Sequence, residues 1–214
     1  MALEVSVVVT TRRQSSNLAG CLATVLRQEY ATAFETLVVE RGGCDEQNQA
    51  AARRAGVQYF FGEPTTPLAA CNAGAREAHG EIVVCLDDDS APQAGWLDAL
   101  VAPFATSVVM IVAGQTKRYS GNMDRRPPSA GDLVVAVDGT QDKSQDTVIT
   151  NFERITSGVN VAFRRHFFEE FGGFDERLES AARPGSFEKS ERLFRMIAAG
   201  YTLVYAPGAV VLHP

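Results

Sequence analysis

Short apolar runs alternate with amphipathic stretches through the first half of the chain. The apolar runs predict buried strands at residues 5–9, 36–39, 57–61 and 82–86. Between them, the spacing of apolar positions predicts helices at about 18–26, 45–55 and 68–79. Gly56 and Gly80 are expected to end the second and third of these helices. This β-α-β-α order predicts an α/β fold with a mostly parallel central sheet, helices on both faces and right-handed crossovers.

The second half is less regular. It predicts helices at about 96–104, 165–171 and 187–199, and strands at 108–113, 158–163, 203–205 and 209–212. The polar stretch 117–147 contains several Gly and Pro residues and predicts a long loop with a short strand at 133–137. Long loops in compact domains are usually functional or partly disordered, and the shape of the binding pocket is expected to depend on this segment.

Composition and charge narrow the class of protein. With 214 residues, 45% of them hydrophobic, the chain can form one large globular domain. A net charge of -6 disfavours a nucleic-acid partner. No apolar run approaches the ~20 residues of a membrane span, and the first residues lack a signal-peptide layout. We therefore expect a cytoplasmic protein, with peripheral attachment to the inner membrane face left open. The four cysteines are widely spaced and are expected to be buried, reduced thiols: Cys21, Cys44, Cys71 and Cys85.

Three consecutive carboxylates follow the apolar run 82–86: Asp87, Asp88 and Asp89. Their like charges repel, and burying them unpaired would cost roughly several kcal/mol per charge. A bound divalent cation would remove that conflict, since Mg²⁺ and Mn²⁺ take oxygen ligands and bridge carboxylates to substrate phosphates. The carboxyl edge of an α/β sheet is also where such folds bind ligands. The alternative is a solvated acidic turn after the strand.

The order of these motifs resembles that of a family 2 glycosyltransferase with the GT-A fold. The segments that carry the resemblance are 5–13 (VSVVVTTRR), 37–45 (LVVERGGCD), 72–74 with 80–89 (NAG, GEIVVCLDDD), 158–165 with 172–176 (GVNVAFRR, GGFDE) and 200–213. The resemblance covers nearly the whole chain. It implies a single domain, 1–214, with a nucleotide-sugar-binding half (1–89) and an acceptor-binding half (90–214).

The resemblance also implies site residues and a Mn²⁺ or Mg²⁺ cofactor. The implied metal ligands are Asp87, Asp89 and His213, where a surface histidine is the alternative for the last. The implied nucleotide-sugar-binding residues are Thr10, Thr11, Arg13, Glu40, Asn72, Asp87 and Asp88. The implied acceptor-binding residues are Trp96, Gly158, Asn160 and Gly173. Three alternatives stay open: an exposed strand end for Glu40, a turn cap for Asn72 and a core aromatic for Trp96.

The expected catalytic base is where the sequence departs from the family pattern. Inverting relatives carry Glu-Asp at the start of the last helix, with a second acidic residue two positions on. The matching residues here are Glu188 and Glu191, and Lys189 occupies the base position. A lysine is cationic at neutral pH, so it is a poor general base for a hydroxyl. Three explanations are open. Glu188 could act as the general base in place of the family's residue, or the enzyme could follow a stereochemical course that needs no such base. Alternatively, the chain could bind a sugar nucleotide without efficient transfer. The alternative for both glutamates is that they lie on an exposed face of the helix and have no catalytic role.

The resulting hypothesis is a metal-dependent, hexosyltransferase-like glycosyltransferase. It would move a sugar from a nucleotide-diphosphate sugar to a hydroxyl of a glycan, lipid or small molecule. The alternative is a non-catalytic sugar-nucleotide-binding or assembly protein of the same fold. A nucleotidyltransferase is less consistent, since residues 10–14 contain no glycine for a phosphate loop. The sequence leaves open the donor, the acceptor, the stereochemical course and the oligomeric state.

Overall fold

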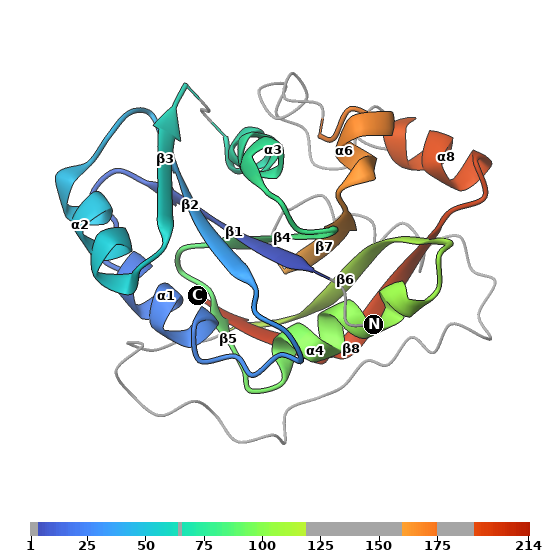
Figure 1. Cartoon of the computed structure of the whole chain (residues 1–214), viewed down its shortest axis with the longest axis horizontal. Coiled ribbons are helices and arrows are strands. Elements are labelled where there is room, and N and C mark those ends of the chain that lie inside the picture. Colours follow the sequence, from blue (N-terminus) through green and yellow to red (C-terminus); the bar gives the residue numbers. More distant parts are fainter. Residues whose placement is uncertain (1–3, 64–65, 119–159, 175–190) are drawn as a thin grey trace.

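The computed structural model describes residues 4–63, 66–118, 160–174 and 191–214, apart from the side chains of 118 and 191–194 (Figure 1). The described strands form one sheet in the order β3-β2-β1-β4-β7-β6-β8-β5. The strands are β1 (Val5–Arg12), β2 (Glu35–Arg41), β3 (Gln58–Gly62), β4 (Ile82–Asp87), β5 (Ala91–Pro92), β6 (Val109–Arg118), β7 (Val161–Arg164) and β8 (Thr202–His213). The helices are α1 (Leu18–Val25), α2 (Glu46–Ala55), α3 (Pro67–Glu77), α4 (Trp96–Val101), the 3₁₀ helix η1 (Ala102–Ala105), α6 (His166–Glu170) and α8 (Glu191–Ala198).

The first half of the chain confirms the predicted parallel arrangement. Strands β3, β2, β1 and β4 pair in parallel, each with its neighbour in that order. In the register, Thr11 of β1 lies opposite Glu40 of β2, and Thr10 lies opposite Asp87 of β4. The carboxyl ends of parallel strands meet at one edge of a sheet, so the polar residues that end these strands come together there.

The second half of the sheet is mixed, which the sequence did not predict. Strand β7 pairs antiparallel with both β4 and β6, and β5 pairs antiparallel with β8. Among the described strands of this half, the β6–β8 pair is the parallel one. The predicted fold class is confirmed: four of the seven strand pairs of the described sheet are parallel, and the three antiparallel pairs all involve β7 or β5.

Strand β8 corrects the prediction of two closing strands around Pro207. It is one strand that pairs with β6 in parallel, with a register shift between the Gly114–Ala206 and Gln115–Val210 pairs. The shift leaves residues 207–209 without register partners on β6, so a bulge accommodates the proline instead of ending the strand. After the bulge β8 pairs with β5, which directly follows the three aspartates.

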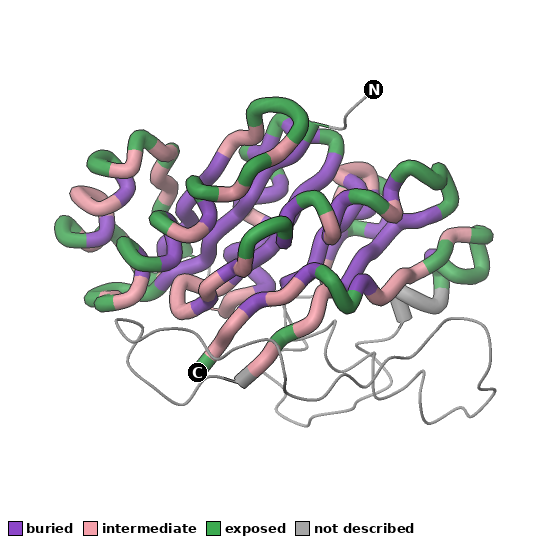
Figure 2. The backbone as a smooth tube through the Cα atoms, turned by 90° about the horizontal axis from the view of Figure 1, so that it is seen from below, coloured by how far each residue is buried: buried purple, intermediate pink, exposed green. Residues whose placement is uncertain are grey.

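Helices cover both faces of the sheet (Figure 1). One buried cluster packs α1, α2 and α4 against the sheet, and the other packs α3, α6 and Met196 of α8 against the opposite face. The strands alternate between the two clusters, as Val38 and Val39 of β2 do. Figure 2 shows the buried residues concentrated in the strands and the exposed ones on the outer helices and turns.

Of the two predicted helix ends, one is confirmed and the other is wrong. Helix α2 ends as predicted at Gly56, which has φ +72° in the left-handed region. Helix α3 ends at Glu77, before the predicted stop at Gly80, because Ala78 is already extended. Gly80 is required for another reason: a Cβ there would lie 2.6 Å from the backbone nitrogen of Ser6, so only glycine fits against β1.

The cysteines depart from the expectation of four buried thiols. Cys71 of α3 and Cys85 of β4 form a disulfide, with their Cα atoms 6.0 Å apart. Cys21 is buried and Cys44 is exposed, and both are free. Local patterns could not predict the pairing, because α3 and β4 meet only through tertiary packing. Among the described residues, no helix has the length and apolar character needed to span a bilayer.

Candidate active site

A pocket of ≈ 290 Å³ opens at the edge of the sheet where β1, β2 and β4 end. Its walls come from the ends of these strands and from the loop between β1 and α1. The lining residues are Arg12, the loop 14–17, Arg41, Asp87, Asp88 and Asp89. The position agrees with the general rule that open α/β sheets bind ligands outside the carboxyl ends of their strands.

Two threonines of β1 hold two of the three carboxylates in place. Thr10 Oγ1 donates a hydrogen bond to Asp87 Oδ1 (2.7 Å), and Thr11 Oγ1 donates to Asp88 Oδ2 (2.5 Å). The backbone N–H of Asp88 also donates to Thr10 O (3.1 Å). Both threonine side chains are buried. Their role in the described structure is to position the aspartates, and direct contact with a nucleotide stays a prediction.

Asp87, Asp89 and His213 form a group that could hold a metal ion. One ligand atom from each lies within 4.8 Å of the other two, and His213 Nε2 is 3.0 Å from Asp89 Oδ1. His213 reaches the aspartates because β8 pairs with β5, two residues beyond Asp89. Two carboxylates and an imidazole suit Mn²⁺ and related divalent ions, so these residues fit the expected metal. His213 is therefore more than an unpaired surface histidine.

The charges of this group shift its pKa values in a consistent way. The hydrogen bond from His213, with a smaller contribution from Arg12, holds the pKa of Asp89 below its usual range. Asp89 in turn raises the pKa of His213. Burial, together with repulsion from Asp89, raises the pKa of Asp87 to about 6, against the opposing hydrogen bond from Thr10. A cation bound near Asp87 would stabilise its ionised carboxylate and so lower the free-energy cost of ionising it.

We expect the affinity for Mn²⁺ to fall as the pH is lowered through the Asp87 pKa of about 6. Below that pH the metal must displace a proton from Asp87, and it must also displace one from His213 wherever the imidazole, whose pKa is raised, is protonated. Each displaced proton costs up to about tenfold in affinity per pH unit. Isothermal titration with Mn²⁺ at a series of pH values from about 5 to 8 measures this. The Asp87→Asn variant should bind weakly with a flatter pH dependence, and a wild-type affinity constant across the range would contradict the assignment.

Glu40 is completely buried, so its alternative role as an exposed strand end is wrong. Tyr59 Oη donates to its Oε2 (2.5 Å), and Asn48 Nδ2 donates to the same oxygen (3.2 Å). Oε1 has no hydrogen-bond partner among the described residues, and burial raises the pKa of this carboxyl group. An unsatisfied buried acceptor is costly, which is consistent with an oxygen reserved for a ligand N–H. Sequence reasoning missed Asn48 and Tyr59; a polar Asn on the buried face of α2 was the available signal.

The arginines that line the pocket are not the arginine that the sequence predicted. Arg13 is exposed and does not line the pocket. Arg12 and Arg41 do line it, and they lie opposite each other in the register of β1 and β2. Sequence reasoning missed both, although each is the residue on which its strand ends. A nucleotide contact by Arg13 stays a prediction.

Asn72 joins the two halves of the chain. Its Nδ2 donates to Phe174 O and its Oδ1 accepts from Phe174 N, both at 2.9 Å. Gly173 has φ +63°, and a Cβ there would lie 2.5 Å from Asn72 Oδ1, so both its conformation and its contact require glycine. The turn-holding alternative for Asn72 is thereby confirmed. Roles for Asn72 in nucleotide binding and for Gly173 in acceptor binding stay predictions.

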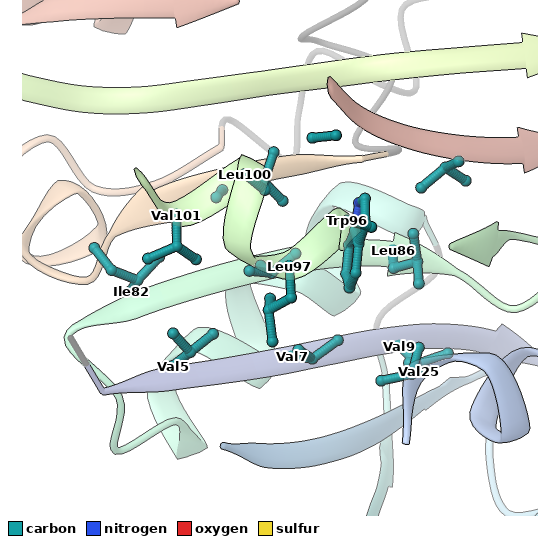
Figure 3. Close-up of a cluster of buried hydrophobic side chains, with 14 of the residues drawn as sticks. Val5, Val7, Val9, Val25, Ile82, Leu86, Trp96, Leu97, Leu100 and Val101 are labelled. Carbon is teal, nitrogen blue, oxygen red and sulfur yellow. The ribbon is translucent and has the colours of Figure 1, made fainter. Parts of the chain in front are cut away.

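Trp96 and Asn160 lie in the core, away from any surface that an acceptor could reach. Both side chains are 0% exposed, and Trp96 Nε1 donates to Asn160 Oδ1 (2.7 Å). Asn160 Nδ2 donates to Gln115 O and Ala209 O, which ties β7 to β6 and β8. Figure 3 shows Trp96 among the buried side chains of β1, β4 and α4. The core alternative for Trp96 is confirmed, and the predicted acceptor role of both residues has no support in the described structure.

The remaining site predictions cannot be placed. Glu188, Lys189 and Gly158 lie outside the described residues, as does the predicted loop beyond Arg118. Glu191 is the first residue of α8, but its side chain is outside the described part. The catalytic roles of Glu188 and Glu191 and the acceptor role of Gly158 stay predictions.

Comparison with known proteins decides the family. The model of the family described as "Glycosyl transferase family 2" matches residues 6–172. The chain belongs to glycosyl transferase family 2. The family's match begins in β1 and ends just after α6, so it includes the pocket and the three aspartates.

Individual relatives agree with the family. The chain is 26% identical over 217 residues to "Glycosyltransferase AglE" of Haloferax volcanii, covering 98% of this chain and 66% of that protein. It is 30% identical over 149 residues to "Pre-mycofactocin glycosyltransferase" of Mycobacterium tuberculosis, covering 69% of this chain and 30% of that protein. The chain therefore spans less than two thirds of the length of these relatives. Its fold is similar, with a TM-score of 0.66 and 20% identity, to that of the mannosyltransferase PcManGT from Pyrobaculum calidifontis, solved in complex with GDP-Man and Mn²⁺, covering 100% of this chain and 57% of that one.

Proposed function

We propose that this family 2 domain is a metal-dependent glycosyltransferase. It would move a sugar from a nucleotide-diphosphate sugar to a hydroxyl acceptor. The observation that supports this best is the meeting of Asp87, Asp89 and His213 at the pocket on the carboxyl edge of the sheet. Asp87 and Asp89 belong to one acidic triplet, whereas His213 comes from the C-terminal strand, far along the chain. An incidental acidic turn would not place that imidazole against it.

Mn²⁺ or Mg²⁺ bound by Asp87, Asp89 and His213 would act as a Lewis acid that stabilises the negative charge of the leaving diphosphate. The chain's own residues prepare this site. Thr10 and Thr11 fix two carboxylates by hydrogen bonds before the donor arrives. The presence of Mn²⁺ and a sugar nucleotide in the PcManGT complex supports Mn²⁺ as the first ion to test.

Glu40 is proposed to recognise the base of the donor nucleotide. Its Oε2 is already occupied by Tyr59 and Asn48, which leaves Oε1 to accept a hydrogen bond from a ring N–H of uracil or guanine. Since Oε1 is buried, the base would have to displace the side chains that cover it, or the loop after β2 would have to shift. Arg13 and Asn72 remain proposed donor-binding residues, and residues 1–89 remain the proposed nucleotide-sugar-binding half.

The proposed acceptor-binding and catalytic residues are supported by the family resemblance alone. Glu188, with Glu191 nearby in the sequence, is proposed to accept the proton of the attacking hydroxyl. Residues 90–214, including Gly158 and Gly173, are proposed to form the acceptor-binding half. We place the protein in the cytoplasm, with contact at the inner membrane face if the acceptor is a lipid.

Lys189 favours a second candidate, a sugar-nucleotide-binding protein without efficient transfer. A cationic residue at the family's base position does not accept a proton from a hydroxyl. The Lys189→Asp variant separates the two functions. Large activation would show that the base is missing in the natural chain, whereas unchanged activity would show that transfer does not depend on that position.

The proposed function is tested by thermal unfolding with UDP, GDP, dTDP, ADP and CDP, each with and without Mn²⁺. A ligand present at 100 times its Kd stabilises the native state by roughly 2.7 kcal/mol, which gives a clear rise in Tm. We expect a Mn²⁺-dependent rise with one nucleotide. No rise with any of the five nucleotides would contradict the proposed donor site.

A further inference from the structure

Two arginines line the pocket together with its three aspartates. Arg12 ends β1 and Arg41 ends β2, and the two residues are register partners on neighbouring parallel strands. Both line the pocket together with Asp87, Asp88 and Asp89. Arg41 Nε donates a long hydrogen bond to Thr11 O (3.4 Å), which anchors the base of its side chain beside β1. In the described part of the chain, neither guanidinium lies within ion-pair distance of a carboxylate.

Two cations in register repel each other in the free protein, although the exposure of Arg12 to water and its attraction to Asp89 weaken the effect. Like charges directly opposite each other on adjacent strands destabilise a sheet. The pocket thus holds two charge conflicts, one among the carboxylates of β4 and one between the arginines of β1 and β2. A divalent cation would relieve the first conflict, but it would leave the second in place. An anionic group bound between the arginines would relieve that one.

Resting on the proposed function, we propose that Arg12 and Arg41 bind the phosphate oxygens of the donor diphosphate directly. The donor would lie with its diphosphate between the metal held by the aspartates and the two guanidinium groups. A dianion approaching three carboxylates is repelled, and two arginines offset part of that repulsion. A guanidinium group presents paired N–H donors that match two phosphate oxygens, and it stays charged at any relevant pH.

In this assignment the arginines bind the diphosphate of the donor and take no part in recognising its base. Glu40 points into the sheet face that carries α2, where it meets Asn48 and Tyr59, and it does not line the pocket with the arginines. The arginines therefore contact the charged part of the donor and leave the base to Glu40. It follows that inorganic pyrophosphate, which has no base or ribose, should also bind to these arginines.

The experiment measures binding, not transfer. Isothermal titration determines the Kd of inorganic pyrophosphate, of UDP and GDP, and of uridine and guanosine, each with Mn²⁺ and with a chelator. The variants are Arg12→Gln, Arg41→Gln and the double variant. Arg53→Gln is the matched control, because Arg53 is an exposed arginine in the last turn of α2. Thermal unfolding of each variant checks that the fold is retained, and Arg41→Lys keeps the charge without the paired donors.

We expect each Arg→Gln change to weaken pyrophosphate and the preferred nucleoside diphosphate by about 10- to 100-fold, as for loss of a hydrogen bond to a charged group. The nucleoside should bind the wild type and the variants equally. Arg41→Lys should recover part of the affinity, and Arg53→Gln should change nothing.

Other results overturn the inference. An equal loss for nucleoside and diphosphate would mean that the arginines contact the base or ribose. Unchanged diphosphate affinity in the double variant, or no pyrophosphate binding by the wild type, would mean that they do not bind phosphate. If the wild type binds pyrophosphate in an arginine-dependent way but no nucleotide, the proposed function fails while anion binding by the arginines stands.

Discussion

Replacing Asp89 by Asn is expected to lower metal-dependent sugar transfer by about 10³-fold or more, as for loss of a principal charge-stabilising group. Asp89 faces both His213 and the pocket, and its low pKa keeps it ionised at neutral pH. Asn keeps the shape of the side chain but removes the charge, so the metal would lose its most strongly ionised ligand. Steady-state rates of donor consumption at saturating Mn²⁺ measure the effect.

The control for this variant is Asp98→Asn, which removes the same charge from an exposed position on α4. It should leave both the rate and the Mn²⁺ dependence unchanged. A second readout is the Mn²⁺-dependent rise in Tm with nucleotide, which Asp89→Asn should abolish. Retention of full activity by Asp89→Asn would exclude the metal site proposed here.

Replacing Trp96 by Ala is expected to lower the free energy of unfolding by about 3–5 kcal/mol, as for other truncations of large buried aromatics. Trp96 is 0% exposed, and its ring lies in the cluster that packs α4 against β1 and β4 (Figure 3). The truncation removes this packing and also leaves Asn160 Oδ1 without the indole N–H. Denaturant unfolding followed by circular dichroism measures the loss.

Trp96→Phe tests which role the residue has. It keeps most of the apolar volume, so the main loss should be about 1–3 kcal/mol from the unpaired Asn160 oxygen. If Trp96 is a core residue, the KM for the acceptor should not change in this variant. A raised acceptor KM with unchanged stability would instead restore the acceptor-wall prediction. Ala99→Ser, at a half-buried position on the same helix, is a control for small changes in α4.

Most of the first half of the fold could be predicted from local patterns. The runs around Val7, Val38 and Val84 are apolar on both faces, as expected for strands buried under helices on both sides. Asp45 and Gly56 mark the two ends of α2 by their capping preferences, which depend only on neighbouring residues. The second half could not be predicted equally well, because antiparallel and parallel neighbours leave similar patterns in buried strands.

The site divides in the same way. That Asp87–Asp89 follow a buried strand, and therefore lie at the edge of the sheet, could be read from the sequence. The charge conflict among them also follows from the sequence, because repulsion between adjacent carboxylates needs no knowledge of distant residues. The residues that position the aspartates or complete the metal-binding group come from elsewhere in the chain. They are Thr10 and Thr11 from β1 and His213 from β8.

The sequence alone thus determined the family resemblance, the parallel half of the sheet and the position of the aspartates. Only the tertiary structure decided that Glu40 is buried, that Trp96 belongs to the core and that Arg12 and Arg41 line the pocket of the aspartates. The physical reason is that strand ends, caps and local charge depend on neighbouring residues, whereas burial and pairing depend on which strands become neighbours. The bulge in β8 shows this most clearly: it sets the register that brings His213 to Asp89 across more than half of the chain.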